Sequence, residues 1–305
     1  MKIQVEDLLE KYKYYLIRVG LAGRTIKEYT YDLKRFFALS QIQSIDSQKA
    51  NQIIDQIRNY VVYLKTNKNH LNRGINRKIS SFRSFFRFLW KEGIVDTNYS
   101  DLIETMKTPK NLPKAISIDQ IKQIINGIDF VFSKTNQKYR DFIQSRNRLI
   151  FVLLVFTGLR VSELVNIKIS DIDLNQKTIS VKGKGDKERI VIFNDYVKEH
   201  LNSYLNIKQR FSGSENVFVS IRNKKMTVRT VQYIFARVSK IMGLKLKITP
   251  HVMRHTFATI MLQNGADIVS IKELLGHSNL STTQIYTKIS VDHLKKNYKI
   301  ENLVL

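Results

Sequence analysis

The spacing of apolar residues predicts that the N-terminal part of the chain is helical. The clearest pattern lies in segment 71–92, where apolar residues recur at the interval of one helix face. These residues are Phe82, Phe85, Phe86 and Leu89. The same period predicts three further helices, near residues 5–19, 24–39 and 48–67. We therefore expect a helical N-terminal domain.

Pro109 and Pro113 mark the end of this helical domain. Each proline moves the residue before it out of the helical region of backbone space, and two lysines accompany them in the segment TPKNLPKAI. The sequence therefore predicts a basic linker at 108–116, between an N-terminal domain at 1–107 and a C-terminal domain at 117–305. A chain of 305 residues has room for about two domains.

The second domain combines helical segments with a small antiparallel sheet. Two β-branched runs within residues 178–193 flank a Gly-Lys-Gly-Asp tetrad, which predicts a hairpin. The segment Val217 to Val219 is a candidate third strand. A capping pair at Ser117 and Gln120 predicts the start of a helix. Helices are expected near 117–128, 195–210 and 227–242, so the fold class is mainly α with a small antiparallel β-sheet in the C-terminal domain.

The charge of the chain indicates a polyanionic partner. Lys and Arg number 51 against 26 Asp and Glu, which gives a formal net charge of +25. Such an excess favours nucleic acid over a membrane surface. The sequence has no Cys, which excludes disulfides, a thiolate nucleophile and a Cys-type zinc site. It has neither the pattern of a signal peptide nor an apolar membrane span, so we expect a cytoplasmic protein.

Two helix faces carry basic residues that suit contact with a DNA backbone. On the helix near 71–92, basic residues alternate with small hydroxyl residues along one face. On the helix near 24–39, basic residues lie opposite the apolar stripe. The alternative is a solvated cationic surface. The candidate DNA contacts are Arg73, Arg77, Arg87 and Lys91 on the first helix, Arg24, Lys27 and Lys34 on the second, and Arg229 and Arg237 near 227–242.

Imidazole, guanidinium and phenol groups gather in the last part of the chain. A Thr-Pro pair at 249–250 suits the start of a helix in which His251 and Arg254 share a face. A second short helix is expected to stop at a glycine directly before His277, and Tyr286 follows a cluster of Ser and Thr. Each residue alone is more often structural, but the set and its spacing favour a site that acts on a phosphate.

A second stretch adds a paired arginine and a lysine. Arg160 directly follows a long apolar run, where a charged guanidinium is costly to bury unless it is paired or meets an anion. Glu163 is placed to hold it, and such a pair is often only a structural salt bridge. Lys184 is expected at or near the tip of the predicted hairpin, and its surroundings do not match a P-loop.

The order of these residues closely resembles the tyrosine recombinase (phage integrase) family, and most of all its Xer-type members. The motifs that carry the resemblance are TGLRVSEL, GKGDKER, HVMRHTFAT and LLGHSNLSTTQIYT. The resemblance implies a two-domain DNA clamp, with a helical core-binding domain and a catalytic domain whose C-terminal tail exchanges between subunits. Segment 129–147 is longer than is usual in the family, and we expect a surface loop or an extra helical turn there. The family's catalytic residues fall on Arg160, Lys184, His251, Arg254, His277 and Tyr286, with Glu163 in support.

The resemblance also implies a mechanism. The two arginines would give forked hydrogen bonds to the scissile phosphate, and His277 would add a donor. Tyr286 would form a 3′-phosphotyrosyl link, with His251 as the base and Lys184 as the acid for the leaving 5′ oxygen. Because the link keeps the energy of the broken bond, no ATP, metal or other cofactor is required.

The implied partners are double-stranded DNA with a specific inverted-repeat site and further copies of the chain, which form a tetramer on two duplex sites. The role is either Xer-like chromosome dimer resolution or the integration and excision of a mobile element. An accessory regulator is compatible with either role, and no membrane partner is expected. Two alternatives stay open, a type IB-like DNA topoisomerase and a non-catalytic DNA-binding protein of the same fold.

The tail is the candidate element for contact between subunits. Val291, Leu294 and Tyr298 fall on one helix face, and the run from Leu303 to Leu305 adds an apolar end. The alternative is that the tail packs on its own domain.

Overall fold

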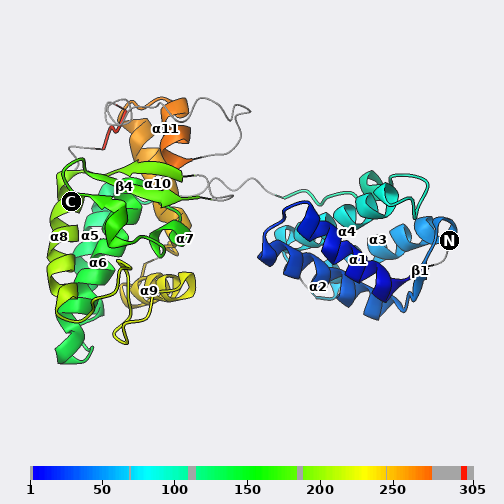
Figure 1. Cartoon of the computed structure of the whole chain (residues 1–305), viewed down its shortest axis with the longest axis horizontal. Helices are drawn as coiled ribbons and strands as arrows, with labels where there is room; N and C mark the ends of the chain where they lie inside the picture. Colours follow the sequence, from blue (N-terminus) through cyan, green and yellow to red (C-terminus); the bar gives the residue numbers. More distant parts are fainter. Residues whose placement is uncertain are drawn as a thin grey trace. The chain divides into compact units, whose positions relative to one another are not determined.

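The computed structural model describes residues 3–68, 70–108, 115–183, 188–244, 246–276 and 297–300. The chain divides into two compact units, Met1–Asn111 and Leu112–Leu305, and each has a hydrophobic core of its own (Figure 1). Across these described ranges, no helix is both long enough and apolar enough to cross a membrane.

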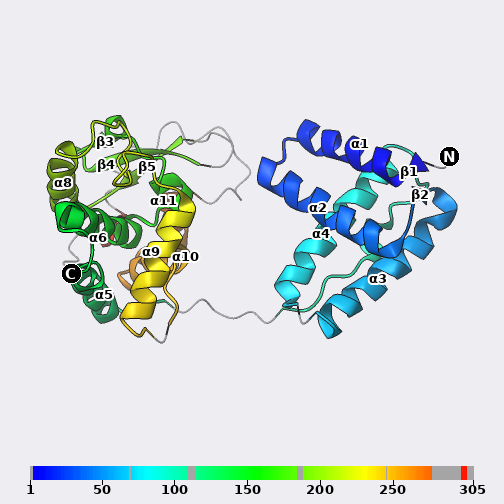
Figure 2. The same cartoon turned by 90° about the horizontal axis from the view of Figure 1, so that it is seen from below.

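Helices make up most of the N-terminal unit. They are α1 (Val5–Arg18), α2 (Gly23–Ser40), α3 (Ala50–Thr66) and α4 (Asn72–Lys91), with short 3-10 helices at Ser47–Lys49 and Tyr99–Leu102. Helix α4 contacts the other three α-helices (Figure 2). A short antiparallel ladder, β1 (Ile3–Gln4) with β2 (Ser44–Ile45), pairs the start of the unit with the connection between α2 and α3.

The predicted apolar stripe of α4 is confirmed as the centre of this core. Its members Phe82, Phe85, Phe86 and Leu89 are all buried. The Phe82 ring meets Phe36 of α2 edge to face at a centroid distance of 5.1 Å, and the Phe85 ring meets Tyr12 of α1 in the same way at 5.2 Å. Aromatic pairs prefer this arrangement, which adds to the gain from burial. Because these rings fix the inner face of α4, the basic residues predicted as DNA contacts lie off that face, whereas Lys78 of the same helix is buried.

The C-terminal unit combines helices with a three-stranded antiparallel sheet, as the sequence predicts. The strands are β3 (Ile172–Asp173), β4 (Thr178–Lys182) and β5 (Glu188–Ile192), in the order β3-β4-β5. The helices are α5 (Ile118–Val131), α6 (Arg140–Thr157), α7 (Val161–Leu164), α8 (Asp195–Gln209), α9 (Val228–Ile241), α10 (Pro250–Gln263) and α11 (Ile268–Leu275). Helix α6 contacts α5, α8 and α10, and α8 runs along it (Figures 1 and 2).

Helix α6 is the frame of this unit. Its second half is the apolar run 149–156, and every residue of that run is buried. A helix that is apolar on all sides belongs inside a core. Segment 129–147 adds helical structure here, because a 3-10 helix at Gln137–Tyr139 leads into α6 at Arg140. The buried frame fixes the point where the chain leaves α6 for the candidate site.

Local capping chemistry sets the helix starts as predicted. The backbone N–H of Gln120 donates to Ser117 Oγ at 3.2 Å, and Ser117 N–H donates to Gln120 Oε1 at 3.1 Å, which makes a capping box for α5. Thr249 Oγ1 accepts from the N–H of Val252 at the start of α10. The predicted hairpin is also present, because β4 and β5 pair in an antiparallel ladder.

The predicted strand at Val217 to Val219 is wrong. Only isolated bridges occur in this region, Lys168 with Asn216 and Val219 with Lys225, and the third strand of the described sheet is β3. All three residues of the run are fully buried, without the alternation of a half-buried strand. An apolar run of this length has the composition of a strand. Here it fills the core without a continuous ladder partner.

Gly158, which ends α6, is a test of how tightly the helices meet beside the site. It has a positive φ of 61°, and a Cβ atom there would lie 2.5 Å from the Phe257 ring and 2.7 Å from Leu275. We expect Gly158→Ala to lower the free energy of unfolding of the C-terminal unit by about 2–5 kcal/mol, the sum of backbone strain and overpacking. Calorimetric unfolding of the full chain measures this change.

Gly243→Ala is the matched control. Gly243 has the same φ of 61°, but no atom of the described residues lies within 4 Å of the position of its Cβ. This variant should lose only the cost of backbone strain, about 1–2 kcal/mol. Equal losses in both variants would show that the contacts around Gly158 contribute nothing.

Candidate functional site

A buried carboxylate holds the first arginine of the predicted catalytic set. Arg160 is the N-cap of α7, and Glu163 lies in the first turn of that helix. Glu163 Oε2 accepts a hydrogen bond from the Arg160 backbone N–H, and Oε1 accepts one from Arg160 Nη1, both at 2.8 Å. The Glu163 side chain is 2% exposed and that of Arg160 is 34% exposed. A carboxylate shielded from water therefore orients a guanidinium that solvent reaches.

The second arginine, Arg254 of α10, points to the same place. Its Nη1 donates to the carbonyl of Gly158 at 2.5 Å and its Nη2 to the carbonyl of Leu275 at 2.6 Å. Arg160 Nη2 donates to the carbonyl of Gly276 at 2.9 Å. Both guanidinium groups thus bind the last carbonyls of α11, where the helix carries partial negative charge. Backbone carbonyls hold the two arginines side by side.

A third arginine, Arg189 of β5, also lies in the site and was not among the residues predicted from the sequence. Its Nη2 donates to Glu163 Oε2 at 3.0 Å, and its side chain is 14% exposed. In the described part of the site, Glu163 therefore binds two guanidinium groups while that of Arg254 binds backbone carbonyls, and positive charge is in excess. Arg189 lies two residues before the buried Val191, on the inner face of its strand. The alternation of inward and outward positions along the strand is the signal that could have identified Arg189.

Burial and positive neighbours lower the pKa of Arg254 to about 10. Desolvation is the largest cause, followed by the charges of Arg160 and Arg189, while Glu163 acts in the opposite direction. Burial also lowers the pKa of Arg189. An anion bound among these groups would offset both the desolvation and the mutual repulsion. The electrostatics of the site therefore favour a negatively charged ligand.

Three of the predicted catalytic residues, Lys184, His277 and Tyr286, lie outside the described residues. Gly276, directly before His277, is described and ends α11 in the left-handed conformation with a φ of 63°. His251 is exposed on the first turn of α10, one turn before the arginine of that helix. The structure thus brings together both predicted arginines and the acid that supports them.

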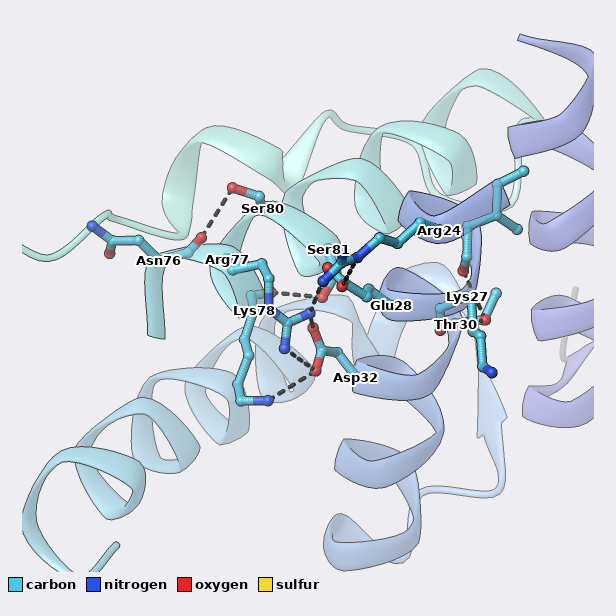
Figure 3. Close-up of polar contacts among 11 residues, drawn as sticks. Arg24, Lys27, Glu28, Thr30, Asp32, Asn76, Arg77, Lys78, Ser80 and Ser81 are labelled. Carbon is cyan, nitrogen blue, oxygen red and sulfur yellow. Dashed lines mark hydrogen bonds and ion pairs between the residues drawn. The ribbon is translucent and has the colours of Figure 1, made fainter. Parts of the chain in front are cut away.

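The basic residues predicted on α2 and α4 are mostly exposed. Arg77 is the exception, because it turns toward α2 (Figure 3). Its two terminal nitrogens donate to the carboxylate of Asp32 at 2.5 and 3.0 Å. The exposed members are Arg24, Lys27 and Lys34 of α2 and Arg73, Arg87 and Lys91 of α4.

Asp32 is the buried centre of this contact between helices. Its side chain is fully buried and also accepts a hydrogen bond from Lys78 Nζ at 2.8 Å. Lys78 is only 6% exposed, so Asp32 neutralises one buried cation and orients a half-exposed one. Glu28 lies 3.9 Å from Arg77 and takes a bond from Arg24 at the edge of the network (Figure 3). The network joins α2 to α4 beneath their basic faces.

The two candidate contacts on α9 differ from each other. Arg229 is exposed near the start of the helix. Arg237 instead lies over the Phe132 ring, 5.0 Å from its centroid, and donates to the carbonyl of Val131 at 3.4 Å. Its guanidinium therefore packs on the end of α5 in its own unit.

The described part of the tail packs on its own unit. Tyr298 is buried and its hydroxyl donates to the carbonyl of Phe156 in α6 at 2.7 Å, while Ile300 is buried nearby in the same core. Val291 and Leu294, the other members of the predicted apolar stripe, lie outside the described residues. At Tyr298 the alternative expectation holds, because this side chain already has a place in its own core.

The Asp32 network generates a stability prediction. We expect Asp32→Asn to lower the free energy of unfolding of the N-terminal unit by about 3–5 kcal/mol, because it leaves the Lys78 ammonium buried without an anion. Trp90 of α4 is the single tryptophan of the chain, so its fluorescence during urea unfolding of the full chain reports on this unit.

Two further variants complete this test. Glu28→Gln removes a half-exposed partner of Arg24 and should change stability by less than about 1 kcal/mol. Combining Asp32→Asn with Lys78→Met should restore most of the loss, because the buried cation is gone. If the double variant stays as unstable as Asp32→Asn alone, an unpaired lysine is not the cause.

Family models match both units, at residues 9–93 (Phage integrase, N-terminal SAM-like domain) and 114–293 (Phage integrase family). The chain is 35% identical over 304 residues to tyrosine recombinase XerA of Thermococcus onnurineus (strain NA1), covering 98% of this chain and 97% of that protein. It is 37% identical over 295 residues to tyrosine recombinase XerC of Bacillus pumilus (strain SAFR-032), covering 94% and 92%. The fold matches lambda integrase in the crystal structure of its tetramer bound to a Holliday junction, with a TM-score of 0.68 at 19% identity, covering 95% of this chain and 81% of that chain. The chain belongs to the phage integrase family, the tyrosine recombinases.

Proposed function

We propose that this chain is a site-specific DNA recombinase that cleaves and rejoins strands through a 3′-phosphotyrosyl intermediate. The observation that carries the proposal is the convergence of Arg160 and Arg254 on the last carbonyls of α11, directly before His277. Glu163 holds the Arg160 guanidinium and backbone carbonyls hold that of Arg254, and such fixed donors are the preorganisation that transition-state stabilisation requires. A scissile phosphate is an anion that can accept forked hydrogen bonds from both arginines.

In the proposed cleavage step, Tyr286 is the nucleophile and His251 its base. The Tyr286 oxygen bonds to phosphorus, the bond from phosphorus to the 5′ oxygen breaks, and Lys184 gives that oxygen its proton. The arginines and His277 donate to the non-bridging oxygens as charge develops. Rejoining is the reverse reaction, with the free 5′-hydroxyl as the attacking group. The linkage keeps the bond energy, so the cycle needs neither ATP nor a metal ion.

Basic residues on both units are proposed to hold the duplex. The exposed side chains of α2 and α4 form a cationic surface that suits phosphate contacts, and Arg229 of α9 is a further candidate contact on the C-terminal unit. Arg77 is held by Asp32, so we assign it to placing this surface as well as to contacting DNA. Arg237 has a smaller part, because its guanidinium packs on Phe132.

The proposed assembly is a tetramer on two duplexes that each carry an inverted-repeat site. The lambda integrase tetramer on a Holliday junction shares this fold and supports the proposal. The proposed domains are 1–107 for DNA binding, a linker at 108–116 and 117–305 for catalysis, with the tail linking subunits. We propose that the enzyme works in the cytoplasm, on a chromosome dimer or a mobile element. An accessory regulator is compatible with either role. The type IB-like topoisomerase and the non-catalytic DNA-binding protein are the alternatives that the tests below address.

The nucleophile assignment is tested with a nicked suicide substrate, in which cleavage releases a short fragment and traps the adduct. Because the substrate sequence is unknown, the bound and cleaved site is first selected from random duplexes. We expect Tyr286→Phe to bind this DNA normally and to form no covalent adduct, since phenylalanine lacks the attacking oxygen. A denaturing gel measures the adduct, and a native gel measures binding.

Tyr298→Phe is the control for this experiment. Its hydroxyl is buried and donates to the carbonyl of Phe156, so it is poorly placed to attack a phosphate. The control should keep forming the adduct. An adduct that survives in Tyr286→Phe and disappears in Tyr298→Phe would contradict the assignment.

The assembly proposal is tested by stopping the chain after Ile300. This truncation keeps Tyr298 and Ile300 in their own core and removes the apolar end from Leu303 to Leu305. We expect binding to one half-site to persist and the pairing of two duplexes to fail, because each lost apolar contact between subunits is worth about 1.5–3 kcal/mol. A native gel with two duplexes of different length shows the pairing.

Two outcomes would count against the assembly proposal. Pairing and strand exchange by the truncated chain would show that the apolar end is not part of the contact between subunits. Relaxation of any supercoiled plasmid by a full-length monomer that never pairs sites would favour the topoisomerase alternative.

A further inference from the structure

We infer that Arg189 is a positioning residue that fixes the β4–β5 hairpin against the active site and so places Lys184 for proton transfer. The inference rests on the proposed function, which makes Lys184 the acid. It concerns a residue that joins three segments of the chain, the hairpin, α7 and the end of α11.

Arg189 occupies an inward-facing position on its strand. β5 pairs with β4 so that Arg189 is opposite Val181 and Val191 is opposite Ile179. Val181, Ile179 and Val191 are buried, so this face of the hairpin packs on the core. Arg189 is therefore the inward-facing residue of β5 that lies nearest to the hairpin tip. It carries a guanidinium where the neighbouring inward-facing residues are apolar.

Arg189 contacts two other segments of the site. Its Nη2 donates to Glu163 Oε2 at 3.0 Å, and the same oxygen accepts the backbone N–H of Arg160 at 2.8 Å. On another side its Cδ and Nε would each lie 2.7 Å from a Cβ added to Gly276. The side chain thus lies across the α-carbon of the residue before His277. One guanidinium connects the hairpin to both other segments of the site.

The burial of Arg189 in this arrangement has an energetic cost. Among the described residues, the buried Nε and Nη1 of Arg189 have no hydrogen-bond partner. Burial lowers the pKa of Arg189, and Arg160 lowers it further while Glu163 raises it. Replacing Arg189 by an apolar side chain of similar length would leave Glu163 paired with Arg160, so the carboxylate would not become an unpaired buried charge. The arginine is therefore better explained by function than by stability.

Beyond Arg189, the described part of the hairpin adds one side-chain contact between its strands. Between Arg189 and the tip, the described contact across the strands is the ion pair of Lys182 with Glu188 at 3.2 Å. Both side chains are exposed, and such pairs contribute little. Lys184 follows Lys182 by two residues, so a fixed Arg189 limits where the lysine can act. Loss of Arg189 should misplace the acid while the phosphate-binding arginines remain.

The test compares two leaving groups in the suicide substrate. One substrate has the natural 5′ oxygen at the scissile phosphate, and the other has sulfur, which leaves as a thiolate without a proton. We expect Arg189→Met to slow cleavage of the oxygen substrate by about 10²-fold, within the range that a general acid contributes. On the sulfur substrate, Arg189→Met and Lys184→Ala should both approach the wild-type rate.

A second measurement does not depend on the role of Lys184. Hydrogen exchange of the full chain should show faster exchange in β4 and β5 of Arg189→Met and unchanged exchange in α6. Lys182→Met is the matched control, because it removes an exposed cation from the same hairpin. It should leave both cleavage and exchange unchanged. Arg189→Lys, which keeps the charge but loses the fork, should fall between wild type and Arg189→Met and serves if Arg189→Met fails to fold.

The outcomes separate the inference from the proposed function. If Lys184→Ala recovers on sulfur but Arg189→Met does not, Arg189 acts elsewhere and the inference is overturned. If Lys184→Ala does not recover, the acid role of Lys184 is wrong, and hydrogen exchange alone decides whether Arg189 fixes the hairpin. Unchanged exchange of β4 and β5 in Arg189→Met overturns the inference in either case.

Discussion

The arrangement of the candidate site depends on one buried carboxylate. Glu163 accepts hydrogen bonds from the backbone and side chain of Arg160 and from the side chain of Arg189. An isolated carboxylate is costly to bury, and three donors offset that cost. Without this acid the two arginines would repel each other inside a poorly solvated region. The anchor therefore allows positive charge to be concentrated at the candidate site.

The N-terminal unit uses the same device at a different place. There Asp32, fully buried, serves Arg77 and Lys78 and ties α2 to α4. In both clusters one acid binds two cations but neutralises the charge of only one. The other cation is thereby held in a fixed orientation, which a flexible side chain alone would not keep. The net charge of +25 thus has two parts, a diffuse one on exposed helix faces and an oriented one held from below.

Periodicity and capping predicted the helices well, because each signal lies within a few adjacent turns. The order of motif residues likewise predicted two arginines, Arg160 and Arg254, that the structure brings together. Arg189 and Asp32 were missed because their partners, Glu163 and Arg77, lie far away in the sequence and periodicity describes only one face at a time. The failed strand at Val217 to Val219 has a related cause, since burial can be read from composition but a ladder partner cannot.

The excess positive charge around Arg160, Arg189 and Arg254 also bears on the solution in which the enzyme works. Small multivalent anions, such as sulfate or inorganic phosphate, match this cluster far better than chloride does. Under the proposed function, the effect of salt on cleavage has two origins, counterion release along the duplex and competition at the scissile position. The first depends on ionic strength and the second on the identity of the anion. Buffers of equal ionic strength are consequently not equivalent for this enzyme.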